Sequence, residues 1–132
     1  MLRKGILNPH LNSLLARVRH NNTLVIADRG CTYFPGVEIV DLSLVDDIPT
    51  VLQVLNAIKP NFDIIQIRMA EEFLLENTMD IQNQFSEACD GIPRIFEPSD
   101  DLKKRVANAI GIIRTADTIQ YANMLLTSGR VE

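Results

Sequence analysis

Apolar positions along the chain follow two alternating spacings, one typical of helices and one typical of buried strands. A helix is predicted to begin at Asn8-Pro9, where a capping amide precedes a proline, and to end near Arg19 or His20. The continuous apolar run Thr23–Ala27 then predicts a strand that is covered on both faces. His20 precedes this strand and Asp28 follows it, so two titratable side chains bracket one buried element.

The same alternation continues to the end of the chain. Further strands are predicted at residues 38–42, 63–69, 93–96, 110–114 and 121–126. Further helices are predicted to begin at Pro49, around Thr78 and at Ser99. Strands that alternate with helices predict the α/β class. We expect a three-layer α/β/α fold with a mixed, mostly parallel sheet, in one domain that spans residues 1–132.

Composition narrows the classes of function. With 132 residues, 46% of them hydrophobic, the chain can build one ordinary core. The net charge of −4 and the scattered Lys and Arg residues argue against a nucleic-acid partner. No apolar run approaches the ~18 residues of a membrane helix, and the first ten residues do not resemble a signal peptide. A cytoplasmic protein is expected.

Common cofactor and metal motifs are missing from the sequence. It contains no glycine-rich dinucleotide or phosphate loop, no nucleophile elbow and no zinc-ligand spacing. No cofactor is therefore expected. Cys31 lies near Asp28, but no second histidine is an obvious base for it, so a nucleophilic role is not favoured. What remains is acid–base chemistry on a small neutral ligand, or simple binding of one.

Four residues carry the candidate chemistry. His20 is a candidate acid or base, because histidine is the residue type suited to proton transfer near neutral pH, although a histidine that ends a helix also has a structural explanation. Asp28 at a strand end is either a site residue or a turn former. In the predicted strand, Tyr121 and Asn123 point to one face and Ala122 to the other. A phenol beside an amide suits sugar hydroxyls, and a polar pair on the surface is the alternative.

Short motifs in a fixed order resemble the D-ribose pyranase and L-fucose mutarotase family along nearly the whole chain. The motifs are Lys4–Asn8, His20, Val25–Asp28 followed by Gly30, Val40–Leu44, Ala70–Glu72, Ile113–Thr115 and Tyr121–Asn123. Gly30 and the Tyr121-Ala122-Asn123 motif resemble the ribose branch more than the fucose branch.

The resemblance implies an enzyme without a cofactor that interconverts pyranose and furanose forms, or anomers, of a free monosaccharide, with D-ribose expected. Its members assemble into rings, often decamers, with sites between subunits. The resemblance makes His20 the proton donor and lets Tyr121 share in proton transfer. The expected sugar-binding residues are Asp28, Arg29, Ser99, Tyr121, Ala122 and Asn123.

Ser99 departs from the family pattern, which has histidine or arginine twenty-two positions before the motif tyrosine. A serine suits a helix cap better than a charged sugar-binding group. Our hypothesis is that Arg29, beside Asp28, supplies the missing positive charge. The departure also leaves two alternatives open: a sugar-binding protein without catalysis, or a structural or regulatory ring protein without a sugar ligand.

The length of the strand between His20 and Asp28 bears on the assembly. Five strand residues span about 16 Å, which is far longer than a monosaccharide. Either the chain folds back sharply or the two residues of one site come from two subunits. We favour two subunits.

Overall fold

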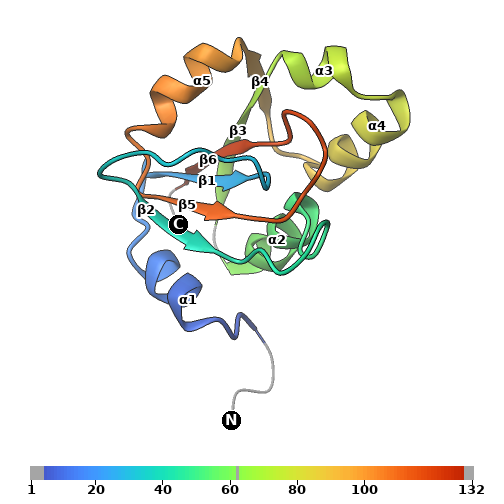
Figure 1. Cartoon of the computed structure of the whole chain (residues 1–132). Coiled ribbons are helices and arrows are strands. Elements are labelled where there is room, and N and C mark those ends of the chain that lie inside the picture. Colours follow the sequence, from blue (N-terminus) through green and yellow to red (C-terminus); the bar gives the residue numbers. More distant parts are fainter. Residues whose placement is uncertain (1–4, 62, 130–132) are drawn as a thin grey trace.

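A mixed sheet of six strands organises the protein, as seen in a computed structural model that describes residues 5–61 and 63–129. The strands lie in the order β2-β5-β1-β6-β3-β4, with β1 between β5 and β6 (Figure 1). Their bounds are β1 Thr23–Ala27, β2 Glu38–Asp41, β3 Ile64–Ala70, β4 Arg94–Glu97, β5 Gly111–Arg114 and β6 Met124–Ser128. β6 runs antiparallel to β1 and β3, and the other pairings are parallel. The predicted mixed, mostly parallel sheet is confirmed.

Helices cover the two faces of the sheet unequally. They are α1 Pro9–Ala16, α2 Val51–Ile58, α3 Glu72–Glu76, α4 Met79–Ala88 and α5 Ser99–Val106, with the 3-10 helix η1 at Lys59–Asn61. The larger apolar cluster joins one sheet face to α1, α2, α3 and α4. The smaller cluster joins the other face to α5 and to apolar side chains of the loop after β1. The three-layer α/β/α prediction is confirmed.

Residue chemistry explains where the helices begin. The Asn8 side chain accepts a hydrogen bond from the backbone N–H of Leu11 at 2.9 Å, with Pro9 in the first turn of α1. Thr50 and Gln53 form a reciprocal capping box at the start of α2. At α5, where Pro98 offers no side-chain cap, the Glu72 carboxylate accepts the N–H of Ser99 instead.

The end of α1 differs from the prediction. The helix ends at Ala16, before the expected Arg19 or His20. The Asn22 side chain accepts the N–H of Arg19 at 2.7 Å, and Asn21 takes a positive φ of 65°. These local contacts compete with further helical hydrogen bonds, so the chain turns into β1 and leaves His20 in an exposed turn.

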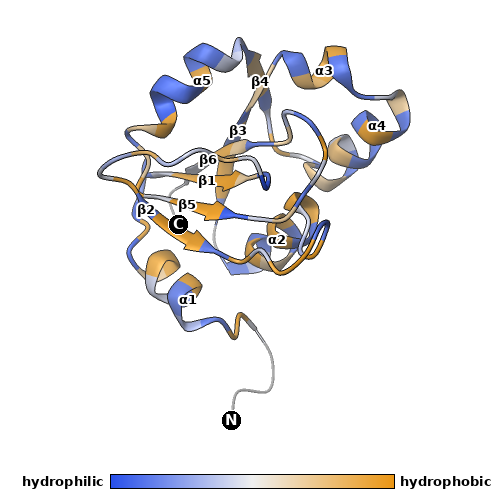
Figure 2. Cartoon of the chain, in the orientation of Figure 1, coloured by the Kyte–Doolittle hydropathy of each residue, from blue (hydrophilic) through white to orange (hydrophobic). Residues whose placement is uncertain are grey.

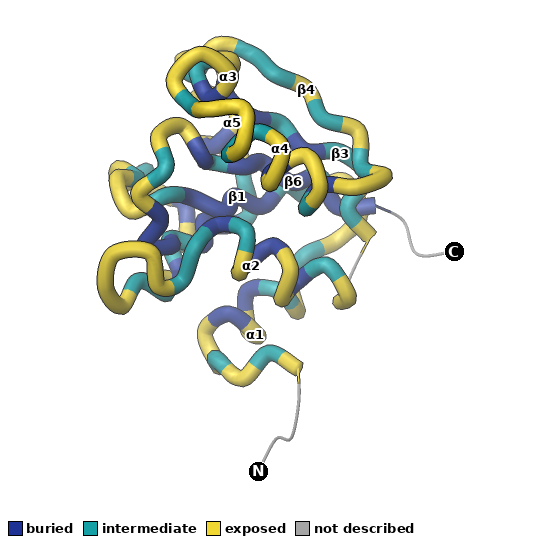
Figure 3. The backbone as a smooth tube through the Cα atoms, turned by 90° about the vertical axis from the view of Figure 1, so that its right-hand side faces the viewer, coloured by how far each residue is buried: buried dark blue, intermediate teal, exposed yellow. Residues whose placement is uncertain are grey.

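The centre of the sheet is the best buried part of the molecule. Four of the five residues of β1 are buried, and so are most residues of β5 and β6. Figure 3 shows β1 and β6 as largely buried strands. β1 and β5 are mainly hydrophobic, whereas α5 is mostly hydrophilic (Figure 2). α5 therefore contributes little more than Leu102 and Val106 to the core, and much of its surface is available for contacts with solvent or a ligand. Among the helices of residues 5–61 and 63–129, none has the length and apolar character that crossing a membrane requires.

Candidate functional site

A cavity of about 410 Å³ opens on the side of the sheet that α5 covers. This volume lies within the range of about 300–1,000 Å³ that small-molecule sites occupy. Apolar side chains of β1 and α5 form part of its wall, together with loop residue Phe34. The polar or charged side chains of its lining are Asp28, Thr32, Ser99, Lys103, Gln120, Tyr121 and Asn123.

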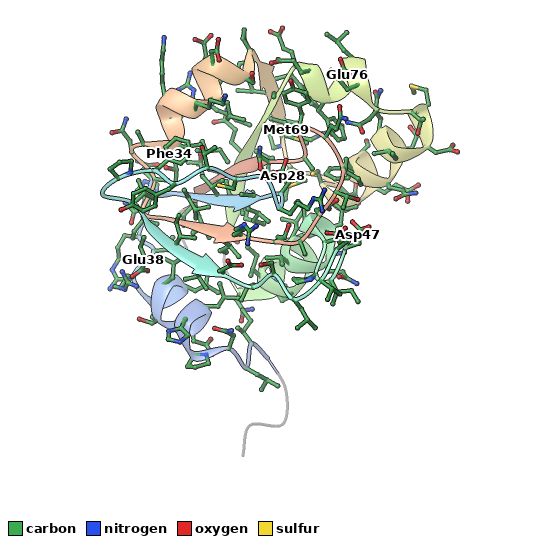
Figure 4. The ribbon with its side chains drawn as sticks, in the orientation of Figure 1. Asp28, Phe34, Glu38, Asp47, Met69 and Glu76 are labelled. Carbon is green, nitrogen blue, oxygen red and sulfur yellow. The ribbon has the colours of Figure 1, made fainter. Side chains whose placement is uncertain are left out.

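Asp28 lies where β1 ends and the chain turns back. Figure 4 shows Asp28 at the arrowhead end of β1 and Phe34 back toward the start of that strand. Phe34 and Cys31 pack against the apolar cluster of this sheet face, so the loop lies over the strand that precedes it. The position is expected for a ligand site, because functional loops follow the carboxyl ends of strands in α/β sheets. Asp28 was predicted as a site residue, and the structure places it in the cavity lining.

The turn that carries Asp28 is held by hydrogen bonds at successive residues. The N–H of Asp28 donates to the side-chain oxygen of Asn123 at 2.7 Å. The N–H of Arg29 donates to the carbonyl of Asp117, and the N–H of Gly30 donates to the Asp28 carboxylate at 2.9 Å. The N–H of Cys31 donates to the carbonyl of Asp28. The carboxylate therefore sits on a preorganised turn rather than on a free loop.

Burial raises the pKa of Asp28 above its ordinary value of 3.8. The hydrogen bond from Gly30 opposes this rise, and the nearby negative charge of Asp117 adds to it. Burial also raises the pKa of the Cys31 thiol, and the Asp28 charge acts in the same direction. The raised thiol pKa disfavours a thiolate nucleophile at Cys31, as expected from the sequence.

Tyr121 and Asn123 reach the cavity by a route that the sequence did not predict. The predicted strand from residue 121 is wrong, because β6 begins at Met124 and Tyr121 lies in a turn with a φ of 56°. Both side chains nevertheless line the cavity, while Ala122 between them is fully buried. Because the Asn123 oxygen accepts from Asp28, the amide –NH₂ is the end of this side chain left for a ligand.

One face of α5 supplies the opposite wall. Ser99 and Lys103 both line the cavity, and they lie four residues apart on the same face of the helix. Ser99 is also engaged by Glu72, and its hydrogen bonds to that carboxylate lower the pKa of Glu72. Lys103 was missed as a site residue. Its spacing from Ser99 was the signal that could have found it.

Three residues predicted for the site lie outside this cavity lining. The guanidinium of Arg29 pairs with the Asp46 carboxylate at 2.6 Å, and both side chains are exposed. Ala122 is buried in the main core cluster. His20 lies in the turn before β1, at the strand end opposite to Asp28. A direct role of these three in sugar binding or catalysis stays a prediction.

The arrangement suits recognition of a small polyhydroxylated ligand. A carboxylate accepts hydrogen bonds, an amide –NH₂ and an ammonium donate them, and a phenol and a serine hydroxyl do both. The apolar part of the wall can take the less polar face of a sugar ring. Within residues 5–61 and 63–129, no three His, Cys, Asp or Glu side chains form a group that could hold a metal ion.

Comparison with known proteins gives a consistent result along the chain. Residues 1–131 match the model of the RbsD / FucU transport protein family. The D-ribose pyranase of Geobacillus kaustophilus is 38% identical over 129 residues, which cover 98% of this chain and 94% of that protein. The D-ribose pyranase of Corynebacterium glutamicum strain R is 36% identical, with 98% of each chain covered.

Solved structures agree with the sequence relatives. RbsD of Bacillus subtilis complexed with D-ribose superposes with a TM-score of 0.92 at 26% identity, covering 100% of both chains. The fucose mutarotase of Streptococcus pneumoniae in complex with L-fucose shares the fold, with a TM-score of 0.73 at 19% identity over 95% of this chain and 94% of that one. The family resemblance seen in the sequence motifs is confirmed. The chain belongs to the RbsD / FucU transport protein family.

Proposed function

We propose that the protein is an isomerase that interconverts the pyranose and furanose forms, or the anomers, of a free monosaccharide, with D-ribose as the expected substrate. The observation that carries the proposal is the convergence of Asp28, Ser99, Tyr121 and Asn123 on one cavity of suitable size. Relatives named D-ribose pyranase support the reaction. The ribose complex of a protein with the same fold supports the pentose.

The proposed reaction needs only acid–base groups. One proton passes from the anomeric hydroxyl to a base, an acid gives one to the ring oxygen, and the reverse transfers accompany ring closure. The ring opens, the carbonyl carbon turns and the ring recloses. Asp28 accepts a hydrogen bond from a sugar hydroxyl, and the –NH₂ of Asn123 donates one. His20 gives the proton to the ring oxygen, and the Tyr121 hydroxyl shares in the transfer. Such groups contribute about 10²–10⁴-fold to a rate.

The proposal requires His20 from a neighbouring subunit. Within one chain, β1 separates the His20 turn from Asp28, and the cavity lining does not include His20. An imidazole must come within hydrogen-bond reach of the sugar to transfer a proton. We therefore place each site between two copies of the chain in a ring-shaped homo-oligomer, with a decamer in the cytoplasm as the expected form.

A mixing experiment tests the shared site. His20→Ala and Asp28→Asn chains are purified separately, then unfolded and refolded together in equal amounts. Ring-form exchange of D-ribose is measured by NMR. Each variant alone has no complete site, whereas mixed assemblies contain sites with both residues intact. Exchange in the mixture well above that of either variant alone supports the shared site. Mixtures as inactive as their components, in assemblies of native size, would contradict it.

Ser99 favours one second candidate, a monosaccharide-binding protein without catalysis. A serine occupies the position where the family has a basic residue, and Glu72 already engages it. NMR separates the two functions when ribose, fucose and galactose are screened. Exchange above background that is lost in His20→Ala supports the isomerase, and binding shifts without exchange support the second candidate.

A further inference from the structure

Arg114 makes the most extensive side-chain contacts near the proposed site, although it does not line the cavity. It lies at the end of β5, in register with Ala27 of β1 on one side and Asp41 of β2 on the other. Ala27 directly precedes Asp28. The arginine therefore sits beside the turn that carries the Asp28 carboxylate.

The guanidinium of Arg114 joins two segments of the chain. Its Nε and Nη2 atoms donate to the carbonyl of Arg29 at 3.1 and 2.7 Å. Its Nη1 atom donates to the Asp41 carboxylate at 2.9 Å and to the Ser43 hydroxyl at 2.8 Å. A planar guanidinium suits this bridge, because its donors are fixed in a fork.

Asp41 and Ser43, which anchor the guanidinium on the β2 side, are themselves held by hydrogen bonds. Both the hydroxyl and the backbone N–H of Ser43 donate to Oδ1 of Asp41, at 2.6 and 2.9 Å, which leaves Oδ2 for Arg114. Desolvation raises the pKa of Asp41 more than any single contact lowers it, but the hydrogen bonds from Ser43 and Arg114 together outweigh desolvation and lower the pKa, so the carboxylate is charged when it meets the arginine.

We propose that Arg114 is a positioning residue: anchored on Asp41 and Ser43, it clamps the carbonyl of Arg29 and so fixes the turn that presents Asp28 to the sugar. This inference rests on the proposed function for its catalytic consequence. Arg29 is the residue next to Asp28, and its carbonyl faces the clamp while its N–H is held by Asp117. Loss of the clamp frees the peptide unit that joins Arg29 to Gly30, whereas the Arg29 N–H stays bonded to Asp117. A misplacement of about 1 Å at a reacting group can cost up to about 100-fold in rate.

The test compares Arg114→Met with Arg68→Met. Arg68 is a matched control because it is also a strand arginine with a half-buried side chain and one carboxylate partner, Glu97, but it does not contact the turn. Two measurements are made on each protein: the ring-form exchange of D-ribose, and the hydrogen exchange of the Arg29, Gly30 and Cys31 amides without sugar. Amides of β6 serve as an internal reference.

We expect Arg114→Met to slow ring-form exchange by about tenfold or more and to accelerate hydrogen exchange in the turn but not in β6. Arg68→Met should change neither measurement. Arg114→Lys should recover part of the rate, because one ammonium replaces only some of the donors. If Arg114→Met does not fold, Ser43→Ala gives the same test with a smaller effect, since it removes one anchor of the clamp.

The results separate this inference from the proposed function. The clamp is overturned if the Arg114 variants keep both the wild-type protection of the turn amides and the wild-type rate of ring-form exchange. Faster hydrogen exchange in the turn with unchanged kinetics would overturn its positioning role. If the wild-type protein exchanges no sugar at all, the proposed function fails, and the hydrogen exchange of the turn alone then decides whether the clamp exists.

Discussion

The two ends of β1 differ in almost every property that matters for a binding site. At the Asp28 end, hydrogen bonds to Arg114, Asp117 and Asn123, together with bonds inside the turn, hold a turn against a cavity. At the His20 end, the backbone of Asn21 and Asn22 pairs with Ser128 of β6, but the His20 side chain points from an exposed turn. The Asp28 end is a preorganised binding site, which we call the receptor end of β1, whereas the other end exposes the His20 side chain to solvent.

Under the proposed function, this difference means that each chain carries two separate parts of a site and completes neither by itself. A buried strand with a rigid receptor at its end cannot bend to bring its own His20 to Asp28, since five strand residues keep them about 16 Å apart. An exposed histidine on a short turn suits a role in the receptor of a neighbouring copy. The proposed chemistry therefore requires that copies of the chain assemble.

The largest expected effect is at the His20 end. His20→Ala should slow ring-form exchange of D-ribose by about 10²–10⁴-fold, because it removes the proposed proton donor. The thermal midpoint should change little, since substitutions at exposed turns usually alter stability by less than about 0.5 kcal/mol. Saturation-transfer NMR measures the exchange rate, and calorimetry measures the midpoint.

His10→Ala is the matched control for that substitution. His10 is also exposed, but it lies on α1, away from β1. Its loss should leave ring-form exchange within twofold of wild type. If His20→Ala and His10→Ala were equally active, the proposal that His20 and Asp28 both contribute to the site would be wrong.

Substitution at the Asp28 end should give a smaller catalytic effect than His20→Ala, together with an effect on stability that depends on pH. Asp28→Asn should slow exchange by about 10–100-fold, as expected for the loss of a hydrogen bond to a charged group.

Because the pKa of Asp28 is raised in the folded protein, ionisation of this group opposes folding. That opposition is absent below its ordinary pKa, grows as pH rises through the folded pKa and is complete above it.

Unfolding measurements test the sign of this effect. The difference in the free energy of unfolding between Asp28→Asn and wild type should shift in favour of the variant from about pH 3 to about pH 7. Asp46→Asn is the control, since Asp46 is an exposed aspartate whose partner is Arg29. A difference that moves in favour of wild type as pH rises would show that the Asp28 charge stabilises the fold.

The sequence predicted β1 to the residue, and the reason is physical. A threonine and four consecutive apolar residues between polar turns have one favourable placement, in the middle of a sheet covered on both faces. Asp28 became a candidate because ligand sites gather where such strands end. The strand alone left a turn former as the alternative, and the family resemblance favoured the site role.

Tyr121 and Lys103 show where sequence patterns reach their limit. The predicted strand began at Tyr121, whereas the apolar run that forms β6 begins only at Met124. No residue type in this segment indicated a left-handed turn at a tyrosine. Lys103 looked like one of three basic residues near a helix end. Only the packing of α5 against the sheet decides which of the three faces the cavity, and that packing depends on residues far apart in the sequence.

The smallest expected effect compares two cations near the cavity. Lys103 lines it, whereas Arg29 pairs with Asp46 outside it. Lys103→Met should weaken D-ribose binding by up to about tenfold through the loss of a charged donor, and Arg29→Met should weaken it less. Titration followed by NMR measures both dissociation constants. The reverse order would mean that Arg29 leaves Asp46 when sugar binds, so that the receptor end of β1 rearranges and is less rigid than its hydrogen bonds imply.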